Sequence, residues 1–251
     1  MREAIGQTKE MQFDPADMGA ASQRNELGRN LTHGMLDTLG KAIVTGRYET
    51  RPFPTEAEIA KAYGVSRSVT REAVKMLTAK GLVSARPRQG TVALPPSHWN
   101  LFDADVLRWL LERKFSVELL RQFNQLRVAI EPEAAALAAQ FHAEVDLVAM
   151  RAGLERMKAA EDGREDPLDA DIAFHVAILR ASQNPFYAQF QTVVTTALRT
   201  SIRFTNRIKG RTANVADHSA VADAIAARDV EAARVAMRRI ICDVLELIGE
   251  E

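Results

Sequence analysis

The chain of 251 residues carries 33 basic and 33 acidic side chains, so its formal net charge at pH 7 is zero, and 47% of its residues are hydrophobic. This length and composition allow two domains with hydrophobic cores, and no apolar run approaches the roughly 18 residues of a membrane-spanning helix. The N-terminus lacks the pattern of a secretory signal, and the lone Cys242 excludes an internal disulfide. These features predict a soluble, cytoplasmic protein.

Residues 1–29 mix glycine, glutamine, aspartate and asparagine with little periodicity, and they predict a mobile N-terminal extension. A helix is then expected over residues 31–48, because apolar side chains recur at helical spacing. These side chains are Leu31, Met35, Leu39, Ile43 and Val44. The first folded domain is therefore expected to begin near residue 30.

A helix-turn-helix pattern follows. Thr55 can cap a helix that starts near Glu56, because Glu58, three residues later, completes a capping box. Ile59, Ala60 and Tyr63 supply its buried side. The pair at residues 64–65, Gly-Val, ends this helix with a sharp change of direction, after which a serine at position 66 caps a second helix.

The second helix has an apolar side and a basic side. Its inward positions are Val69, Ala73, Met76 and Leu77, whereas Arg67, Arg71 and Lys75 fall on another face. Strand-like residues 82–85 and 91–94 then flank the sequence Arg-Pro-Arg-Gln-Gly at residues 86–90. Such a basic hairpin can meet a phosphate backbone or a minor groove. The order of these features favours a winged helix-turn-helix over ordinary solvated charges.

The neutral total hides two modules of opposite charge. Residues 30–94 carry ten basic and five acidic side chains, a net charge of +5, whereas residues 95–251 carry 19 and 23, a net charge of −4. Clustered positive charge favours DNA because binding releases counterions. We therefore expect a winged helix-turn-helix DNA-binding domain over residues 30–94, a linker over residues 95–102, and a second domain over residues 103–251.

The second domain has helical periodicity almost throughout, so the predicted fold is mainly α, with the winged helix-turn-helix followed by an all-helical antiparallel bundle. The expected helices span residues 103–112, 117–141, 144–161, 168–182, 186–208, 213–227 and 230–248. The buried stripe expected on the second of these helices comprises Leu119, Phe123, Leu126, Ile130, Ala134, Leu137 and Phe141. Apolar residues near the linker fit a subunit contact, an interdomain contact or a monomer core: Leu107, Trp109, Leu110 and Leu111.

Three polar residues fall on sides of helices that are expected to face the core. Arg127 lies beside the apolar stripe, and a buried guanidinium needs an anion, which is either Glu131 one turn away or a carboxylate ligand. His175, four residues after Asp171, and His218 lie on apolar sides of two other helices. Spacing alone leaves both histidines open to interpretation as ordinary core residues or as ligands.

These motifs resemble the GntR family of bacterial transcription regulators, and the helical part is similar to the effector domain (FCD type) of its FadR branch. The DNA-binding half of the resemblance is carried by Pro54, Gly64 to Arg67, Arg71 to Ala73, Leu77, Gly81 to Val83, and Gly90 to Val92. The helical half is carried by Arg127, Glu131-Pro132, Asp171 to His175, Asn184-Pro185 and His218. The run at residues 99–109 also resembles the interdomain segment of a sugar-acid-responsive subgroup.

The resemblance implies a homodimer that binds a palindromic operator, with the second helix in the major groove and the wing at the flanking minor groove. The DNA-contacting residues that it implies are Arg67, Ser68, Thr70, Arg71, Arg86, Arg88, Gln89 and Gly90. Some family members have an arginine where this chain has Ala57, so one DNA contact is expected to be missing.

The resemblance also implies a divalent metal (Zn, Ni or Mn) held by Asp171, His175 and His218. The family's third histidine is replaced by Thr196, which leaves a weaker site with positions open to water or ligand oxygens. For the effector, the expected contacts are Arg127, Thr196, Arg199, Thr200 and Arg203, because guanidinium and hydroxyl groups suit a polyhydroxylated acid.

The leading hypothesis is a ligand-controlled repressor of sugar-acid or hydroxy-acid catabolism that a small carboxylate releases from its operator, and we expect no enzyme activity. One rival is an acyl-CoA or fatty-acid sensor of the same branch. A second rival is a metal-dependent hydrolase fused to a DNA-binding domain. The sequence disfavours the hydrolase, because it has no evident general base beside the metal cluster, phosphate-binding loop or nucleophile elbow.

Overall fold

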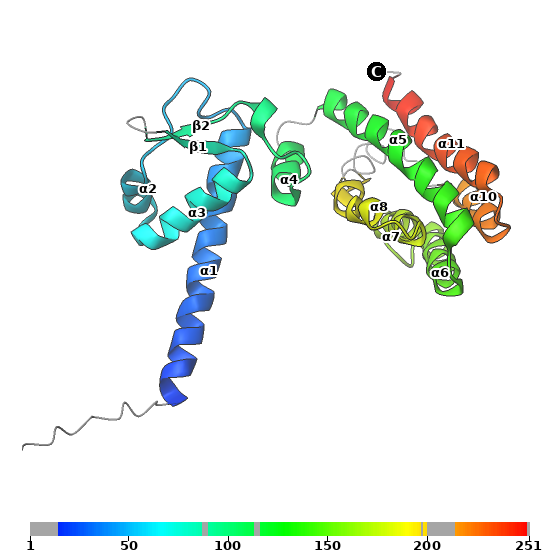
Figure 1. The fold of residues 1–251 in the computed structure, drawn as a ribbon, viewed down its shortest axis with the longest axis horizontal. Helices are drawn as coiled ribbons and strands as arrows, with labels where there is room; N and C mark the ends of the chain where they lie inside the picture. Colours follow the sequence, from blue (N-terminus) through cyan, green and yellow to red (C-terminus); the bar gives the residue numbers. More distant parts are fainter. Residues whose placement is uncertain (1–14, 87–89, 113–115, 197, 200–213, 250–251) are drawn as a thin grey trace, which may run out of the picture. The chain divides into compact units, whose positions relative to one another are not determined.

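The computed structural model describes residues 15–86, 90–112, 116–196, 198–199 and 214–249 (Figure 1). The chain divides into two compact units between Asn100 and Leu101, within the predicted linker. The described elements are helical apart from one small hairpin, which confirms the predicted mainly α class. None of the described helices is long and apolar enough to cross a membrane.

The first unit is built from α1 (Pro15–Val44), α2 (Glu56–Tyr63), α3 (Arg67–Ala79), β1 (Val83–Arg86), β2 (Gly90–Ala93) and a 3-10 helix, η1 (Pro96–His98). Helix α1 begins at Pro15 rather than near Leu31, so residues 15–29, which the sequence assigned to a mobile extension, are helical. Proline is well tolerated in the first turn of a helix, and a helix already anchored by packing extends at little cost. Residues 1–14 lie outside the described part of the chain.

The core of the first unit lies where α1 packs against α3. The residues at its centre are almost completely buried: Leu36, Leu39, Ile59, Ala73, Leu77 and Leu82. Tyr63, which was predicted to be buried, is instead 42% exposed, because α2 is short and Ile59 alone of its residues is buried. Burial of a leucine or isoleucine side chain contributes about 1.5–3 kcal/mol.

The predicted caps and turn of the helix-turn-helix are present. The Thr55 hydroxyl accepts a hydrogen bond from the Glu58 amide at 3.3 Å, and a Glu58 carboxylate oxygen accepts one from the Thr55 amide at 2.8 Å. Gly64 has a φ of 64°, which ends α2 in the left-handed conformation, and the Ser66 hydroxyl caps α3. The strands β1 and β2 pair antiparallel, from Val83 with Ala93 to Arg86 with Gly90.

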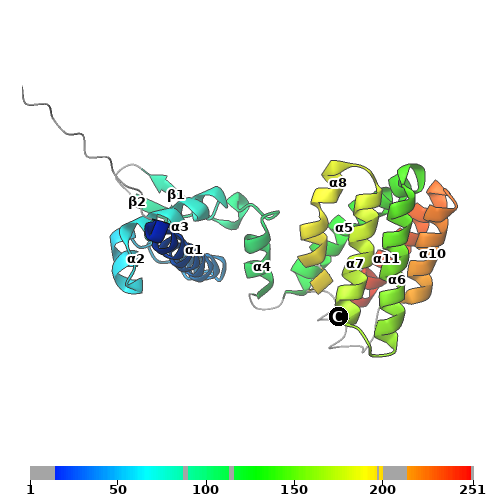
Figure 2. The same ribbon diagram turned by 90° about the horizontal axis from the view of Figure 1, so that it is seen from below.

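The second unit contains α4 (Ala104–Glu112), α5 (Val117–Phe141), α6 (Glu144–Glu161), α7 (Pro167–Ala181), α8 (Pro185–Gln189), α10 (Val215–Ala226) and α11 (Val230–Gly249). Helix α5 packs against α7 and α11, α6 packs against α7, and α10 packs against α5, α6 and α11. The main helices lie side by side in both views of this unit (Figures 1 and 2). The helices α5, α6 and α11 follow the predicted bounds to within one residue.

The helix predicted over residues 186–208 is interrupted. Helix α8 ends at Gln189, Phe190 forms a turn, and residues 191–196 are helical again. The Phe190 ring packs edge-on against Phe102, with ring centroids 5.8 Å apart, which holds the turn in place. Residues 200–208 lie outside the described part of the chain.

The buried face of α5 differs from the predicted stripe. Phe141 is 57% exposed, whereas Asn124, Arg127 and Glu131 are almost fully buried. Alanines fill the neighbouring buried positions and let α7 and α11 approach closely: Ala134, Ala135, Ala138 and Ala139. The predicted stripe is therefore correct at Phe123 and Ala134, which are buried, and wrong at Phe141, while alanines and paired polar residues extend the contact face beyond it.

Helices α6 and α7 also approach closely, at Gly153. A Cβ atom at this position would lie 3.1 Å from the Phe174 Cα atom. The absence of a side chain therefore lets α6 lie against the backbone of α7 beside His175. This contact fixes the position of the residues of α7 that form the site described below.

Candidate functional site

The exposed face of α3 carries the predicted DNA-contacting residues. Arg67, Ser68 and Arg71 are exposed, and Arg67 has no ion-pair partner among the described residues. The opposite face of α3 packs into the core through Ala73, Val74 and Leu77. A helix that is anchored on one side and basic on the other can enter a major groove without rearranging its core.

Thr70 was also predicted to contact DNA, and the structure corrects this prediction. Its side chain is fully buried, and its hydroxyl donates to the Ser66 carbonyl at 3.3 Å. It therefore supports the first turn of α3 from inside the domain and does not face DNA. The burial of Thr70 could not be predicted from the sequence, because this residue lies between the polar and the apolar sides of the helix.

Arg71 has an intramolecular partner. Its Nε atom lies 3.7 Å from a carboxylate oxygen of Glu56, at the start of α2. Both side chains are largely exposed, so the pair contributes little stability. The guanidinium can exchange this partner for a DNA phosphate at low cost.

The wing contributes Gly90, which has a φ of 77° and opens β2 opposite Arg86. The remaining wing residues predicted to contact DNA, Arg88 and Gln89, lie outside the described residues, and only the backbone of Arg86 is described. Ala57 lies on α2, where its methyl group offers no hydrogen-bond donor to DNA.

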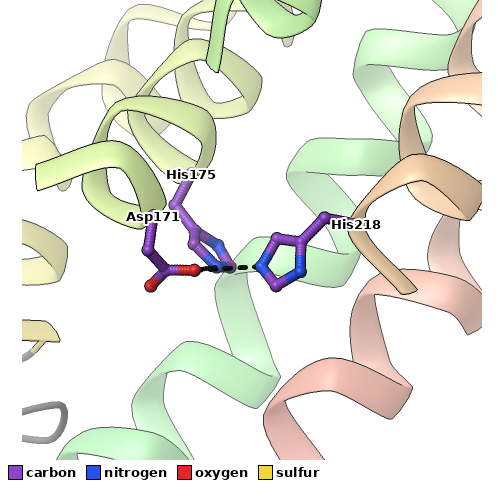
Figure 3. Close-up of side chains that lie close together, drawn as sticks. All are labelled: Asp171, His175 and His218. Atoms are coloured by element: carbon purple, nitrogen blue, oxygen red, sulfur yellow. Dashed lines mark ion pairs between the residues drawn. The ribbon is translucent and has the colours of Figure 1, made fainter. Parts of the chain in front are cut away.

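The second unit brings Asp171, His175 and His218 together in its interior (Figure 3). Asp171 and His175 extend from one side of α7, and His218 extends from α10 toward them. The three side chains offer one ligand atom each, all within 4.8 Å of one another, and all three residues are buried. The predicted i, i+4 pair and the distant histidine thus share one site.

A hydrogen-bond acceptor next to Nδ1 fixes the orientation of each imidazole. His218 Nδ1 lies 2.7 Å from the Asn214 carbonyl, which can only accept, so Nδ1 carries the proton. His175 Nδ1 lies 2.5 Å from Glu131 Oε2. A metal-binding histidine usually donates its other ring N–H to a carboxylate or carbonyl in this way. Both histidines therefore direct Nε2 toward Asp171.

Nε2 of His218 is a buried polar atom without a hydrogen bond in the described structure. It lies 3.0 Å from Asp171 Oδ1, but the alignment is not that of a hydrogen bond. His175 Nε2 lies 3.7 Å from the same oxygen. A lone pair and a carboxylate oxygen that converge without a proton between them suit a divalent cation. The donor set of two imidazoles and one carboxylate therefore fits the metal that the sequence resemblance implied.

Arg127 and Glu131 form a buried ion pair next to this cluster. Arg127 Nε donates to Glu131 Oε1 at 2.6 Å, and Arg127 Nη1 donates to the Asn124 side-chain oxygen at 3.2 Å. A further guanidinium nitrogen, Nη2, lies 3.4 Å from His175 Nε2. Of the two sequence interpretations of Arg127, the internal ion pair is thus present, and one edge of the guanidinium still borders the cluster.

The carboxylates in this network are held in their ionised form. Burial raises the pKa of Glu131, but the Arg127 charge and the hydrogen bonds from Arg127 and His175 outweigh it and lower the pKa to about 2. Burial also raises the pKa of Asp171, and His175 and His218 together lower it below its usual range. Asp171 is therefore available as an anionic ligand at neutral pH.

The predicted effector residues do not lie in one place. Arg127 borders the cluster, whereas Thr196 and Arg199 line a groove on a different side of α7. Thr200 and Arg203 lie outside the described residues. Thr196 and Arg199, which helical spacing placed on one face, line the same groove, but α7 separates this groove from the cluster that Arg127 borders.

Two members of the network were not predicted from the sequence. Asn124 links the Leu120 carbonyl to Arg127, and the Asn214 carbonyl fixes the tautomer of His218. Asn124 carries a weak signal, because it precedes Arg127 by three residues and so shares its helix face. A backbone carbonyl carries no sequence signal at all.

Two family models match the chain. The model of the bacterial regulatory proteins of the gntR family matches residues 34–92, and that of the FCD domain matches residues 122–242. The first match covers the helix-turn-helix and wing. The second covers α7 and the cluster of Asp171, His175 and His218.

Two bacterial transcriptional regulators align with the chain over most of their length. The galactonate operon transcriptional repressor of Escherichia coli K12 is 33% identical over 217 residues, which cover 84% of this chain and 94% of the relative. The transcriptional regulator YieP of the same organism is 32% identical over 227 residues, which cover 89% and 98%.

The fold is also found in solved structures. The structure of Lar from Listeria monocytogenes has a TM-score of 0.57 at 21% identity, and the match covers 87% of this chain and 96% of the other. The structure of Escherichia coli McbR/YncC has a TM-score of 0.51 at 18% identity, with 88% and 97% covered. The chain therefore belongs to the GntR family of DNA-binding transcriptional regulators, with an FCD domain as its helical unit, and not to a class of enzymes.

Proposed function

We propose that this regulator is a repressor of sugar-acid or hydroxy-acid catabolism that leaves its operator when a small carboxylate binds its helical unit. The observation that carries the proposal is the buried cluster of Asp171, His175 and His218 with the Arg127 guanidinium beside it. The similarity to a galactonate operon repressor supports the ligand class. Because its target is bacterial operator DNA, the protein acts in the cytoplasm.

A cation at this cluster would be held by Asp171 Oδ1 and by Nε2 of His175 and His218. Such an ion supplies a Lewis-acidic centre with positions left for oxygen atoms of a hydroxy acid. Arg127 presents Nη2 at the same place and would donate to the ligand carboxylate. Glu131 holds both Arg127 and His175 in position for this contact.

On the DNA side, Arg67, Ser68 and Arg71 of α3 contact the operator in our proposal, together with Arg86, Arg88, Gln89 and Gly90 of the wing. A homodimer would place two copies of α3 on the half-sites of a palindrome. The effector can release the operator only if it binds the DNA-free arrangement more tightly than the DNA-bound one.

A band-shift titration tests the effector class. We expect galactonate or another aldonate at millimolar concentration to release the protein from operator DNA, because the carboxylate engages Arg127 and the cation. Galactose is the matched control, since it lacks the carboxylate, and it should leave the complex intact. Retention of the complex with every aldonate and uronate tried would overturn the sugar-acid assignment.

The Arg67→Ala variant tests the recognition face. We expect operator affinity to fall about tenfold or more, because an arginine contact to a base or phosphate contributes about 1–3 kcal/mol. Fluorescence anisotropy with labelled operator measures this change. Arg164→Ala is the control, because Arg164 is an exposed arginine of the helical unit, paired with Asp162. Equal affinity of both variants and the wild type would contradict the assigned face.

A further inference from the structure

We propose that the groove lined by residues of α6, α7, the helical segment 191–196 and Arg199 binds a small organic acid, at a site separate from the cluster of Asp171, His175 and His218. The groove has a volume of about 550 Å³, which is within the range of small-molecule sites. This site goes beyond the proposed effector contact at Arg127.

The groove is positively charged within an acidic domain. Three arginines line it, from three different segments: Arg156 of α6, Arg180 of α7 and Arg199. Asp169 is the one carboxylate among the described lining residues. Residues 95–251 as a whole carry a net charge of −4, so the cationic lining is a local feature and not a general property of this unit.

Arg180 is the residue best placed to bind the acid. Its Nε and Nη2 atoms donate to the side-chain oxygen of Gln191, at 3.2 and 2.9 Å, and no carboxylate pairs with it among the described residues. A neutral amide oxygen thus occupies the edge of the guanidinium that best accommodates a carboxylate. If a ligand carboxylate took the place of this amide oxygen, Arg180 would donate to a charged acceptor in place of a neutral one, and such hydrogen bonds are stronger.

The other two arginines are held by exposed ion pairs. Arg199 Nη2 lies 2.9 Å from Asp169, and Arg156 Nε lies 2.7 Å from Glu165. All four side chains are 37–49% exposed, so these pairs contribute little stability and can exchange partners.

The remaining lining suits the carbon skeleton of the acid. Ile172 and Val176 of α7 give the groove apolar lining, and Thr192 and Thr195 add hydroxyl groups. Inorganic phosphate would use the arginines and leave the apolar side chains uncovered. The combination therefore favours an organic acid over a simple inorganic anion.

The groove and the cluster lie on different sides of α7. Ile172 and Val176 line the groove, whereas Asp171 and His175 face the interior. Variants of one site can therefore be made without removing a residue of the other, and the two can be tested independently.

Calorimetry on the full-length His218→Ala variant, stripped with EDTA, isolates the groove from the cluster. Galactonate is the probe, with inorganic phosphate and galactose for comparison. We expect galactonate to bind this variant, and the additional substitution Arg180→Gln to weaken that binding at least about tenfold. Arg164→Gln is the control, because it removes an exposed arginine outside the groove and should change nothing.

Methyl NMR locates the binding. Galactonate should shift the Ile172 methyl signal, while that of Ile225, which is fully buried in the core, should stay in place. Unchanged affinity in Arg180→Gln, no binding once the cluster is disabled, or equal binding of phosphate would overturn the proposal. These are binding measurements, so they remain decisive even if no sugar acid releases the operator.

Discussion

Replacing Glu131 with glutamine is expected to cost about 3–5 kcal/mol of unfolding free energy, because it leaves the Arg127 charge buried without its partner. Both side chains are at most 3% exposed, so water cannot compensate. The change also removes the carboxylate that accepts from His175 Nδ1. We therefore expect weaker metal retention, by about 10- to 100-fold, since outer partners of a ligating histidine contribute that much.

Chemical denaturation measures the stability, and competition with a coloured chelator measures metal affinity. Glu118→Gln is the matched control on the same helix. Glu118 also pairs with an arginine, Arg121, but both side chains are about half exposed, so its loss should cost less than about 1 kcal/mol. Equal stability of the two variants would contradict the role assigned to the buried pair.

The double variant Arg127→Met with Glu131→Leu separates two effects of the Glu131 substitution. One is the loss of stability from an unpaired buried charge, and the other is the loss of the carboxylate that orients His175. Replacing both charges by apolar side chains should recover much of the lost stability, because no charge is then left buried and unpaired. Metal affinity should stay low, because leucine cannot accept a hydrogen bond from His175. Full recovery of both properties would contradict a positioning role for Glu131.

The loss of stability in the Glu131→Gln variant is expected to depend on pH. The free energy of unfolding of both proteins is measured in EDTA, so that no metal contributes. The pKa of Glu131 is lowered in the folded state from about 4.5 to about 2, so its stabilisation is complete above about pH 4.5 and is lost as the pH falls toward 2. The difference in stability between the wild type and the Glu131→Gln variant should therefore shrink over this interval. A constant difference would contradict an ionised Glu131.

The sequence was sufficient for local structure, and together with the family resemblance it gave the three residues that meet in the buried cluster. Caps such as Thr55 with Glu58 act within four residues, and Asp171 and His175 are one helical turn apart, so spacing alone gave their geometry. The pairing of this turn with His218 came from the family resemblance. It could not have come from spacing, because His218 lies on a different helix and is brought there only by tertiary packing.

Two of the failures have a common physical cause. Phe141 and the predicted helix over residues 186–208 were assigned from periodicity, which describes one helix in isolation, whereas Thr70 was assigned from the family resemblance. Helix α5 packs against α7, α10 and α11 largely through alanines and a buried, paired arginine, and a stripe of large apolar residues does not reveal such a contact face. The separation of Arg127 from Thr196 and Arg199 likewise depends on which sides of α7 face the core and the solvent.

Gly81→Ala is expected to be the most damaging substitution in the DNA-binding unit. Gly81 follows α3 with a φ of 74°, and the Leu82 amide donates to the Leu77 carbonyl, which closes a Schellman motif. A Cβ atom at Gly81 would lie 2.2 Å from the His98 carbonyl oxygen, which belongs to the backbone and cannot rotate away. We expect a loss of about 3 kcal/mol or more, from strain at positive φ and displacement of this segment.

Gly64→Ala is the control that isolates the clash, because Gly64 has a similar φ of 64° but no atom within 4 Å of the added Cβ. It should cost only about 1 kcal/mol. The fluorescence of Trp99, followed in a Trp109→Phe background during denaturation, reports on this unit, because the Trp99 indole donates to the Leu94 carbonyl. Equal losses of unfolding free energy in the Gly64→Ala and Gly81→Ala variants would contradict this prediction, because they would show that the His98 segment can move away from the added Cβ atom at no cost.

The position of the clash gives this comparison a functional meaning. The Asn100 amide donates to the Lys80 carbonyl, so the segment that follows His98 is attached to the residue that caps the C-terminal end of α3. A shift of that segment must therefore move or release the C-terminal end of the recognition helix. If this attachment transmits the effector signal, Gly81→Ala at permissive temperature should reduce operator affinity and also its response to the effector, whereas Gly64→Ala should retain the response.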